Sequence, residues 1–131
     1  MEKEISLPVM GSEQAKTSAI IKTLSFIKTE WDLSYEKISE LAHVPKSTIE
    51  RWIKEKKIPS TAKTEIDLLV HFIAIYKSLS QMFESKRNLN SWLVSPHPRL
   101  NNQKPIELMK SNVEGLIIVR RYLDYTRGRG A

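Results

Sequence analysis

The chain has 131 residues, 40% of them hydrophobic and 27% charged, which is the composition of a soluble globular protein rather than a disordered one. The absence of cysteine excludes disulfides, thiolate zinc sites and cysteine nucleophiles, and no apolar run approaches the roughly 18 residues that a membrane span needs. The net charge of +6 is compatible with a polyanionic partner, and the start of the chain lacks an apolar signal core, so a cytoplasmic location is expected.

Helical periodicity dominates the sequence and predicts an all-α fold. Residues 1–16 are expected to form a flexible arm, because Pro8 and Gly11 interrupt them and their apolar residues have no period. A first helix is predicted over residues 17–30. Its inward stripe consists of Ile20, Ile21, Leu24 and Ile27.

Residues 34–54 predict a helix-turn-helix, in which two helices meet around a tight turn. Ser34 is expected to cap a helix over 35–42, and the next helix is expected to begin near Pro45. His43 stands in the turn where glycine is commonest, and histidine tolerates left-handed backbone better than most other residues. The predicted buried residues of the pair are Ile38, Leu41, Val44, Ile49, Trp52 and Ile53.

The opposite face of the second helix would enter a major groove of DNA. Its candidate DNA-binding residues are Lys46, Ser47, Thr48, Glu50, Arg51 and Lys54. Lys46, Ser47 and Arg51 are expected at base edges, and the others at phosphates, except that Glu50 could read cytosine or hold a neighbouring basic side chain. The alternative is an ordinary helical pair with a solvated basic face.

A long fourth helix is predicted over residues 62–84, with two apolar stripes instead of one. Ile66, Leu69, Val70, Ile73 and Tyr76 form the first stripe, and Leu68, Phe72, Ile75, Leu79 and Met82 form the second. A helix that is apolar on two sides must be covered on both. Its second side therefore needs the C-terminal segment or a second chain, which makes a homodimer one of the expected partners.

The remainder of the chain predicts shorter elements. Helices are expected over 87–94 and 105–109, separated by X-Pro steps that favour extended backbone. Ser111 and Glu114 form a capping-box pair for a final helix over 112–126, followed by a flexible basic tail. The predicted stripe of the final helix consists of Val113, Leu116, Ile117, Arg120 and Leu123.

Two segments carry distinctive motifs. The first begins at Leu33 and reads LSYEKISELAHVPKSTIERW. The second contains Trp92-Leu93, Ser95-Pro96-His97-Pro98-Arg99-Leu100, Lys104-Pro105-Ile106-Glu107-Leu108, and then Gly115, Val119 and Leu123. They resemble, respectively, the helix-turn-helix and the toxin-binding pattern of the Xre/MbcA/ParS-type antitoxins, which are partners of RES-domain toxins. Asn101 and Asn102 depart from the usual glycines, although asparagine also adopts left-handed turns.

The helical pattern and the resemblance together imply a division into an arm (1–16), an Xre-like helix-turn-helix domain with the long helix (17–85) and a toxin-binding domain (86–131). It implies an antitoxin that neutralises a RES-type toxin, an enzyme that consumes NAD or transfers ADP-ribose, by covering its NAD site. It also implies repression of the antitoxin's own operon through operator DNA. The antitoxin itself would catalyse nothing and hold no cofactor.

The candidate toxin-binding residues are Trp92, Pro96, His97, Pro98, Arg99, Arg127 and Arg129. Trp92 could instead anchor the core of its own module, and the proline turn could be a mere corner between helices. Arg127 and Arg129 could meet carboxylates of a partner, or belong to a frayed terminus.

No catalytic constellation is recognisable in the sequence. His43, His71 and His97 are assigned to a turn, a helix and a loop, so a metal site is not expected; His71 is expected to be a partly buried helix residue. The functional alternative is a free-standing helix-turn-helix repressor whose C-terminal segment only dimerises it. The two hypotheses differ over residues 86–131, since only an antitoxin needs a stable complex with a second protein.

Overall fold

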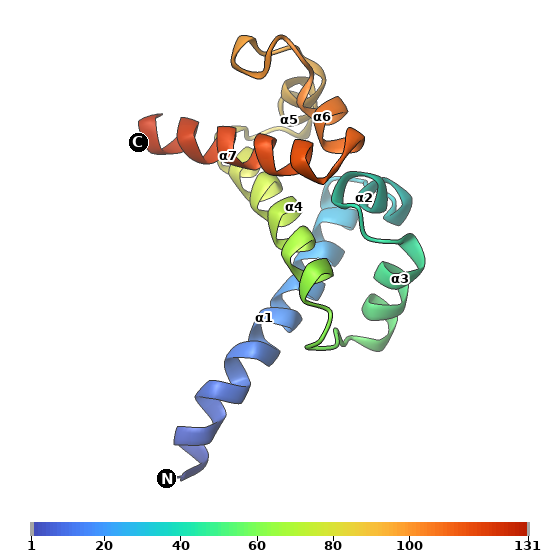
Figure 1. The fold of residues 1–131 in the computed structure, drawn as a ribbon, viewed down its shortest axis with the longest axis vertical. Helices are drawn as coiled ribbons and strands as arrows, with labels where there is room; N and C mark the ends of the chain where they lie inside the picture. The colour runs from blue at the N-terminus through green and yellow to red at the C-terminus, as the bar shows by residue number, and fades with distance from the viewer. Residues whose placement is uncertain (1, 131) are drawn as a thin grey trace.

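The computed structural model describes the backbone of residues 2–130 and the side chains of residues 13–128. Seven α-helices and one 3-10 helix follow one another in this part of the chain, so the all-α prediction is confirmed (Figure 1). They are α1 (Glu2–Glu30), α2 (Tyr35–Ala42), α3 (Lys46–Glu55), α4 (Lys63–Met82), α5 (Lys86–Val94), η1 (Pro98–Leu100), α6 (Pro105–Ser111) and α7 (Val113–Gly130). None of the described helices is long and apolar enough to cross a membrane.

The first helix is longer than predicted. α1 begins at Glu2, so residues 2–16 are helical and the irregular arm expected there is wrong. Proline removes one backbone donor and glycine weakens a helix, but neither Pro8 nor Gly11 ends α1. The predicted inward stripe is confirmed, since Ile20, Ile21, Leu24 and Ile27 are all buried.

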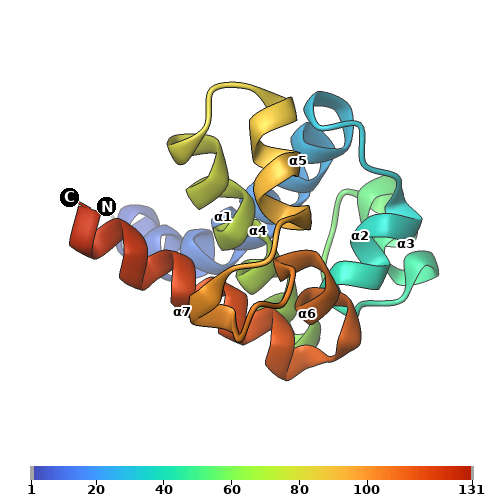
Figure 2. The ribbon, with the colours of Figure 1, turned by 90° about the horizontal axis from the view of Figure 1, so that it is seen from above.

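Helix α4 is the centre of the core. It packs against α1, α2 and α5, and α7 crosses it, as both views of the ribbon show (Figures 1 and 2). Both predicted stripes of α4 are buried, except that Val70 is half-buried and Met82 is exposed. Both stripes are therefore covered largely within one chain, and α7 of the C-terminal segment is one of the helices that pack on α4.

The ends of the helices show which predicted caps form. The hydroxyl of Ser34 accepts a hydrogen bond from the amide of Lys37 at 3.0 Å, as expected for the N-cap of α2. The predicted capping box before α7 is wrong. Because α6 continues through Ser111, the extended residue Asn112 caps α7 instead, and its Oδ1 accepts from the amide of Gly115 at 2.7 Å.

Helix α7 differs from its prediction in length and in its buried face. It continues to Gly130, so the tail expected after residue 126 to be flexible is helical. Its buried side chains are Leu116, Val119 and Leu123, whereas Val113 is exposed. Helix α7 packs mainly on α4 and α6 and makes a smaller contact with α2, so its buried face differs from the single predicted stripe.

Candidate functional site

The two helices predicted over residues 34–54 form as α2 and α3, with a tight turn between them. Ile38 and Leu41 of α2 and Ile49 of α3 have no exposed surface. His43 adopts the left-handed conformation expected of the turn, with φ 62° and ψ 34°. These contacts fix how α3 projects from the body of the protein, at one side of the molecule (Figure 1).

The candidate DNA-binding residues share the outer face of α3. Lys46, Ser47, Glu50, Arg51 and Lys54 are exposed, and Thr48 is half-buried. The first turn of α3 contains no acidic residue, and Lys54 lies in its last turn. Trp52 faces the core, as predicted, and is 3% exposed. The face that α3 offers is therefore polar and mostly basic.

The C-terminal candidates gather around an aromatic cluster formed by Trp92, His97 and Tyr122. The ring of Trp92 lies 4.7 Å from that of His97 and is stacked on that of Tyr122 at 6.3 Å. A carbonyl oxygen can only accept, so Nε2 of His97 donates to the carbonyl of Trp92 at 3.0 Å. Trp92 and His97 are half-buried, so each has both a structural contact and an accessible edge.

The loop that carries His97 has a defined backbone. The amide of His97 donates to the carbonyl of Gln103 at 3.2 Å, and the amide of Asn102 donates back to the carbonyl of His97 at 2.9 Å. Asn101 and Asn102 have φ 56° and 61°, so the expectation that these asparagines adopt left-handed turns is confirmed. Pro96 and Pro98 are exposed on this braced loop.

The three candidate arginines, Arg99, Arg127 and Arg129, differ in what the structure shows of their side chains. The guanidinium of Arg99 lies 5.7 Å above the ring of Tyr125 and is exposed. Nη1 of Arg127 donates to the hydroxyl of Ser78, a buried residue of α4, at 3.1 Å, so this arginine is tied to the protein's own helix. The side chain of Arg129 lies outside the described residues.

Sequence reasoning missed two residues of this surface, Tyr122 and Tyr125. They are three residues apart on α7 and so lie on one face of the helix, beside Trp92 and Arg99 respectively. That i, i+3 aromatic pair outside the apolar stripe was the available signal. Trp92, His97 and Arg99 are brought together with these tyrosines, whereas Arg127 binds α4.

A polar contact joins α4 and α7. Nη1 of Arg120 donates to Nδ1 of His71 at 3.1 Å, and Nε of Arg120 lies 3.5 Å from a carboxylate oxygen of Asp124. Partial burial, together with the positive charge of Arg120, lowers the pKa of His71 from its ordinary value. His71 is half-buried on its helix, as predicted.

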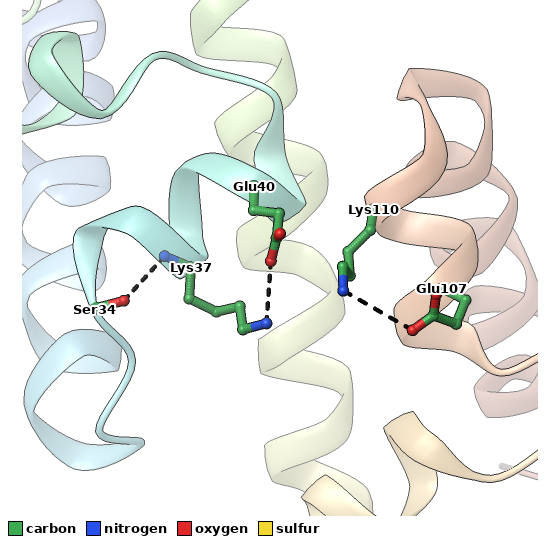
Figure 3. A network of polar contacts seen from close by, with 5 residues as sticks. All are labelled: Ser34, Lys37, Glu40, Glu107 and Lys110. Carbon is green, nitrogen blue, oxygen red and sulfur yellow. Dashed lines mark hydrogen bonds and ion pairs between the residues drawn. The ribbon is translucent and has the colours of Figure 1, made fainter.

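A second set of polar contacts lies where α2 faces α6. Nε2 of His43 donates to the carbonyl of Met109 at 2.7 Å. Lys37 contacts Glu40 at 3.0 Å and Lys110 contacts Glu107 at 3.9 Å, with Glu40 and Lys110 on facing helices (Figure 3). The hydrogen bond from Lys37 lowers the pKa of Glu40, and the charge of Lys110 adds to this.

The C-terminal part of the chain is similar in sequence to a known protein domain. Residues 78–129 match the sequence model of the antitoxin Xre/MbcA/ParS C-terminal toxin-binding domain. This segment is therefore similar to the toxin-binding domain of the Xre/MbcA/ParS antitoxins, and residues 78–129 are called the antitoxin domain below. The fold is also similar to that of a chain in the crystal structure of the M. tuberculosis MbcT–MbcA toxin–antitoxin complex, with a TM-score of 0.54 and 19% identity over 79% of this chain and 89% of that one. A comparison with curated proteins finds no match.

The antitoxin domain contains the aromatic cluster, the braced loop and α7. The matched range begins inside α4, at Ser78, the residue whose hydroxyl accepts from Arg127 near the other end of the range. The start of the domain and its final helix are thus bonded to each other. The division of the chain at residue 86 stays a prediction.

Proposed function

We propose that this protein is an antitoxin that binds and neutralises a RES-type toxin through the surface around the aromatic cluster. The observation that carries the proposal is the antitoxin-family match over residues 78–129, within which the cluster and the braced loop lie. The partner would be an enzyme that consumes NAD or transfers ADP-ribose. This protein would act by binding alone, in the cytoplasm.

The chemistry of the surface supports a protein partner. Tryptophan, tyrosine and arginine are enriched at the centres of protein interfaces, where they contribute most of the binding energy. Here Trp92, Tyr125 and Arg99 lie on one side of the antitoxin domain, and Tyr125 is 48% exposed. The loop is held by backbone hydrogen bonds within residues 97–103, so little conformational freedom is lost when it binds.

Growth rescue tests this function. The reading frame adjacent to the gene is expressed alone, with the native chain, and with a chain carrying Arg99→Glu and Tyr125→Ala. We expect toxicity and a fall in cellular NAD that the native chain cures and the double variant does not. Arg87→Glu, an exposed charge reversal at the start of α5, is the matched control and should rescue. A toxic neighbour that the native chain leaves toxic contradicts the proposal.

We also propose that α3 binds operator DNA and represses the operon. The specific observation is the exposed basic face of α3, held on a helix-turn-helix with its turn in the expected left-handed conformation. A homodimer would present two such helices to half-sites about 34 Å apart. Binding to a duplex from upstream of the gene should weaken steeply as salt rises, because lysines that neutralise phosphates release counterions. Affinity that is constant between low and moderate salt would contradict this docking.

If the chain binds that duplex but forms no complex with the product of the adjacent reading frame, the free-standing repressor becomes the better hypothesis. Size-exclusion chromatography of the two proteins expressed together distinguishes these cases. An antitoxin gives one co-eluting peak, and a free-standing repressor elutes by itself.

A further inference from the structure

The turn of the helix-turn-helix is fastened to the antitoxin domain by a side chain. His43 lies between α2 and α3, and its imidazole bonds the carbonyl of Met109, 66 residues further along the chain. Met109 lies in the last turn of α6, where carbonyl groups have no partner within the helix. The bond therefore satisfies a group that α6 leaves free, and it ties that group to the turn from which α3 starts.

His43 makes this contact from a backbone conformation that glycine adopts more easily. A residue with a Cβ is less stable than glycine in the left-handed region, and glycine is what this turn usually contains. His43 nevertheless adopts φ 62°. Glycine would relieve the backbone strain but would lose the imidazole, which is the group that reaches α6.

Charge complementarity supports the same docking of α2 on α6. Lys37, Glu40, Lys110 and Glu107 alternate in sign across the two helices (Figure 3). Packing adds to it, since Ala42 beside the turn and Met109 opposite it are both fully buried. The turn is thus held to the antitoxin domain by the hydrogen bond from His43. The positive charge of Lys110 near Glu40 and the burial of Ala42 and Met109 support the same arrangement.

We propose that His43 is a positioning residue for DNA readout: by fastening the turn to Met109 of α6 it sets the angle at which α3 enters the major groove, so that the antitoxin domain is a structural part of the DNA-reading unit. The inference rests on the DNA-binding function proposed for α3. Base-edge hydrogen bonds depend on the angle of the helix, whereas attraction to phosphates is far less directional. Loosening the turn should therefore lower specific binding and leave non-specific binding unchanged.

The test compares two duplexes of equal length, one from upstream of the gene and one of scrambled sequence, each titrated with the full chain. For the native chain we expect clearly tighter binding to the upstream duplex. In His43→Gly the specificity ratio should fall about tenfold, or about 1.4 kcal/mol, which is the size of roughly one lost base contact. Affinity for the scrambled duplex should stay within about twofold, because the phosphate contacts remain.

Lys56→Gly is the matched control. Lys56 ends α3, also has a positive φ of 55° and is exposed, so this change also replaces a left-handed residue by glycine. It removes a basic side chain, so it should weaken binding to both duplexes alike and preserve their ratio. A lower specificity ratio in His43→Gly, together with an unchanged ratio in Lys56→Gly, would show that the effect comes from losing the imidazole and not from placing glycine in a left-handed turn.

His43→Asn is a second variant that keeps a residue tolerant of left-handed backbone but shortens the side chain. It should lower the ratio as His43→Gly does. A native ratio in both folded variants overturns the inference and leaves the proposed DNA binding intact. Equal affinity of the native chain for the two duplexes contradicts sequence-specific DNA binding itself, and the inference then fails with it.

Discussion

At the scale of single residues, Arg51 offers the cleanest separation of the two proposed activities. It is exposed on the outer face of α3, remote from the aromatic cluster in the chain and on a different element. Arg51→Ala should weaken operator binding by about 1–3 kcal/mol, the usual loss when a base-edge contact is removed. Toxin neutralisation should be unchanged. Operator titration and growth rescue measure the two activities.

Arg121→Ala is the control for Arg51→Ala. Arg121 is an exposed arginine of α7, so its removal lowers the net charge equally without touching α3. Its operator affinity should stay close to that of the native chain. Equal loss of both activities in a folded Arg51→Ala protein would contradict the assignment of Arg51 to DNA.

His71 predicts a pH dependence of stability. Its pKa in the folded protein lies below its ordinary value of 6.5, so the unfolded chain binds a proton at His71 more readily than the folded protein does. The free energy of unfolding should therefore decrease as the pH falls from about 7.5 through 6.5 and towards the lowered pKa. Thermal unfolding at pH 7.5 and pH 5.5 measures this.

His71→Gln supplies the comparison for that experiment. Glutamine cannot titrate, and its carbonyl oxygen can still accept from Arg120. The melting temperature of this variant should fall less between the two pH values than that of the native protein. An identical fall in both proteins would show that His71 does not contribute to the pH dependence.

At the scale of helices, the crossing of α6 and α7 depends on Gly115. A Cβ built on Gly115 would overlap the carbonyl oxygen of Leu108, a backbone atom that cannot move aside as a side chain does. Gly115→Ala should therefore separate the two helices and destabilise the protein by about 1–3 kcal/mol. Chemical denaturation measures the free energy of unfolding.

Gly128→Ala is the matched substitution on the same helix. A Cβ at Gly128 would meet nothing within 4 Å, and alanine is favoured over glycine in a helix by about 0.5–1 kcal/mol. This variant should be as stable as the native protein or slightly more stable. A large loss of stability in Gly128→Ala, or none in Gly115→Ala, would contradict the packing described for α7.

At the scale of the whole molecule, the α2–α3 pair and the antitoxin domain share one core. Helix α7 packs on α4, and α1 and α2 pack on the same helix. A chain ending at Ser85 would lose α7 and expose a face of α4 that includes fully buried side chains. We expect this truncated chain to aggregate or to unfold without a cooperative transition.

Circular dichroism and light scattering of the truncated chain test that expectation. A truncated protein that is monomeric, melts cooperatively and binds DNA as well as the full chain would contradict a shared core. It would also argue against the positioning proposed for His43. Point variants are therefore preferable to truncation for assigning toxin neutralisation to the C-terminal surface.

The local pattern of the sequence predicted most elements and the turn conformations. Apolar spacing of 3 to 4 residues located the helices, and the capping preference of Ser34 and the backbone tolerance of His43 and Asn101 were read correctly. These features depend on a few neighbouring residues. The N-cap of α7 was predicted at Ser111 but lies at Asn112, because α6 continues through Ser111. Where α6 ends depends on tertiary packing, which a local pattern does not contain.

The sequence by itself determined the fold class, the exposed polar face of α3 and the similarity of the C-terminal segment to an antitoxin domain. Periodicity, exposure opposite a buried stripe and motif order are all local properties of the chain. Only the tertiary structure decided which surface covers α4, that Tyr122 and Tyr125 join Trp92 and Arg99, and that His43 reaches Met109. These contacts join residues up to 66 positions apart. Their distances depend on the angles at which helices cross, and those angles are set by the packing of side chains from several elements at once.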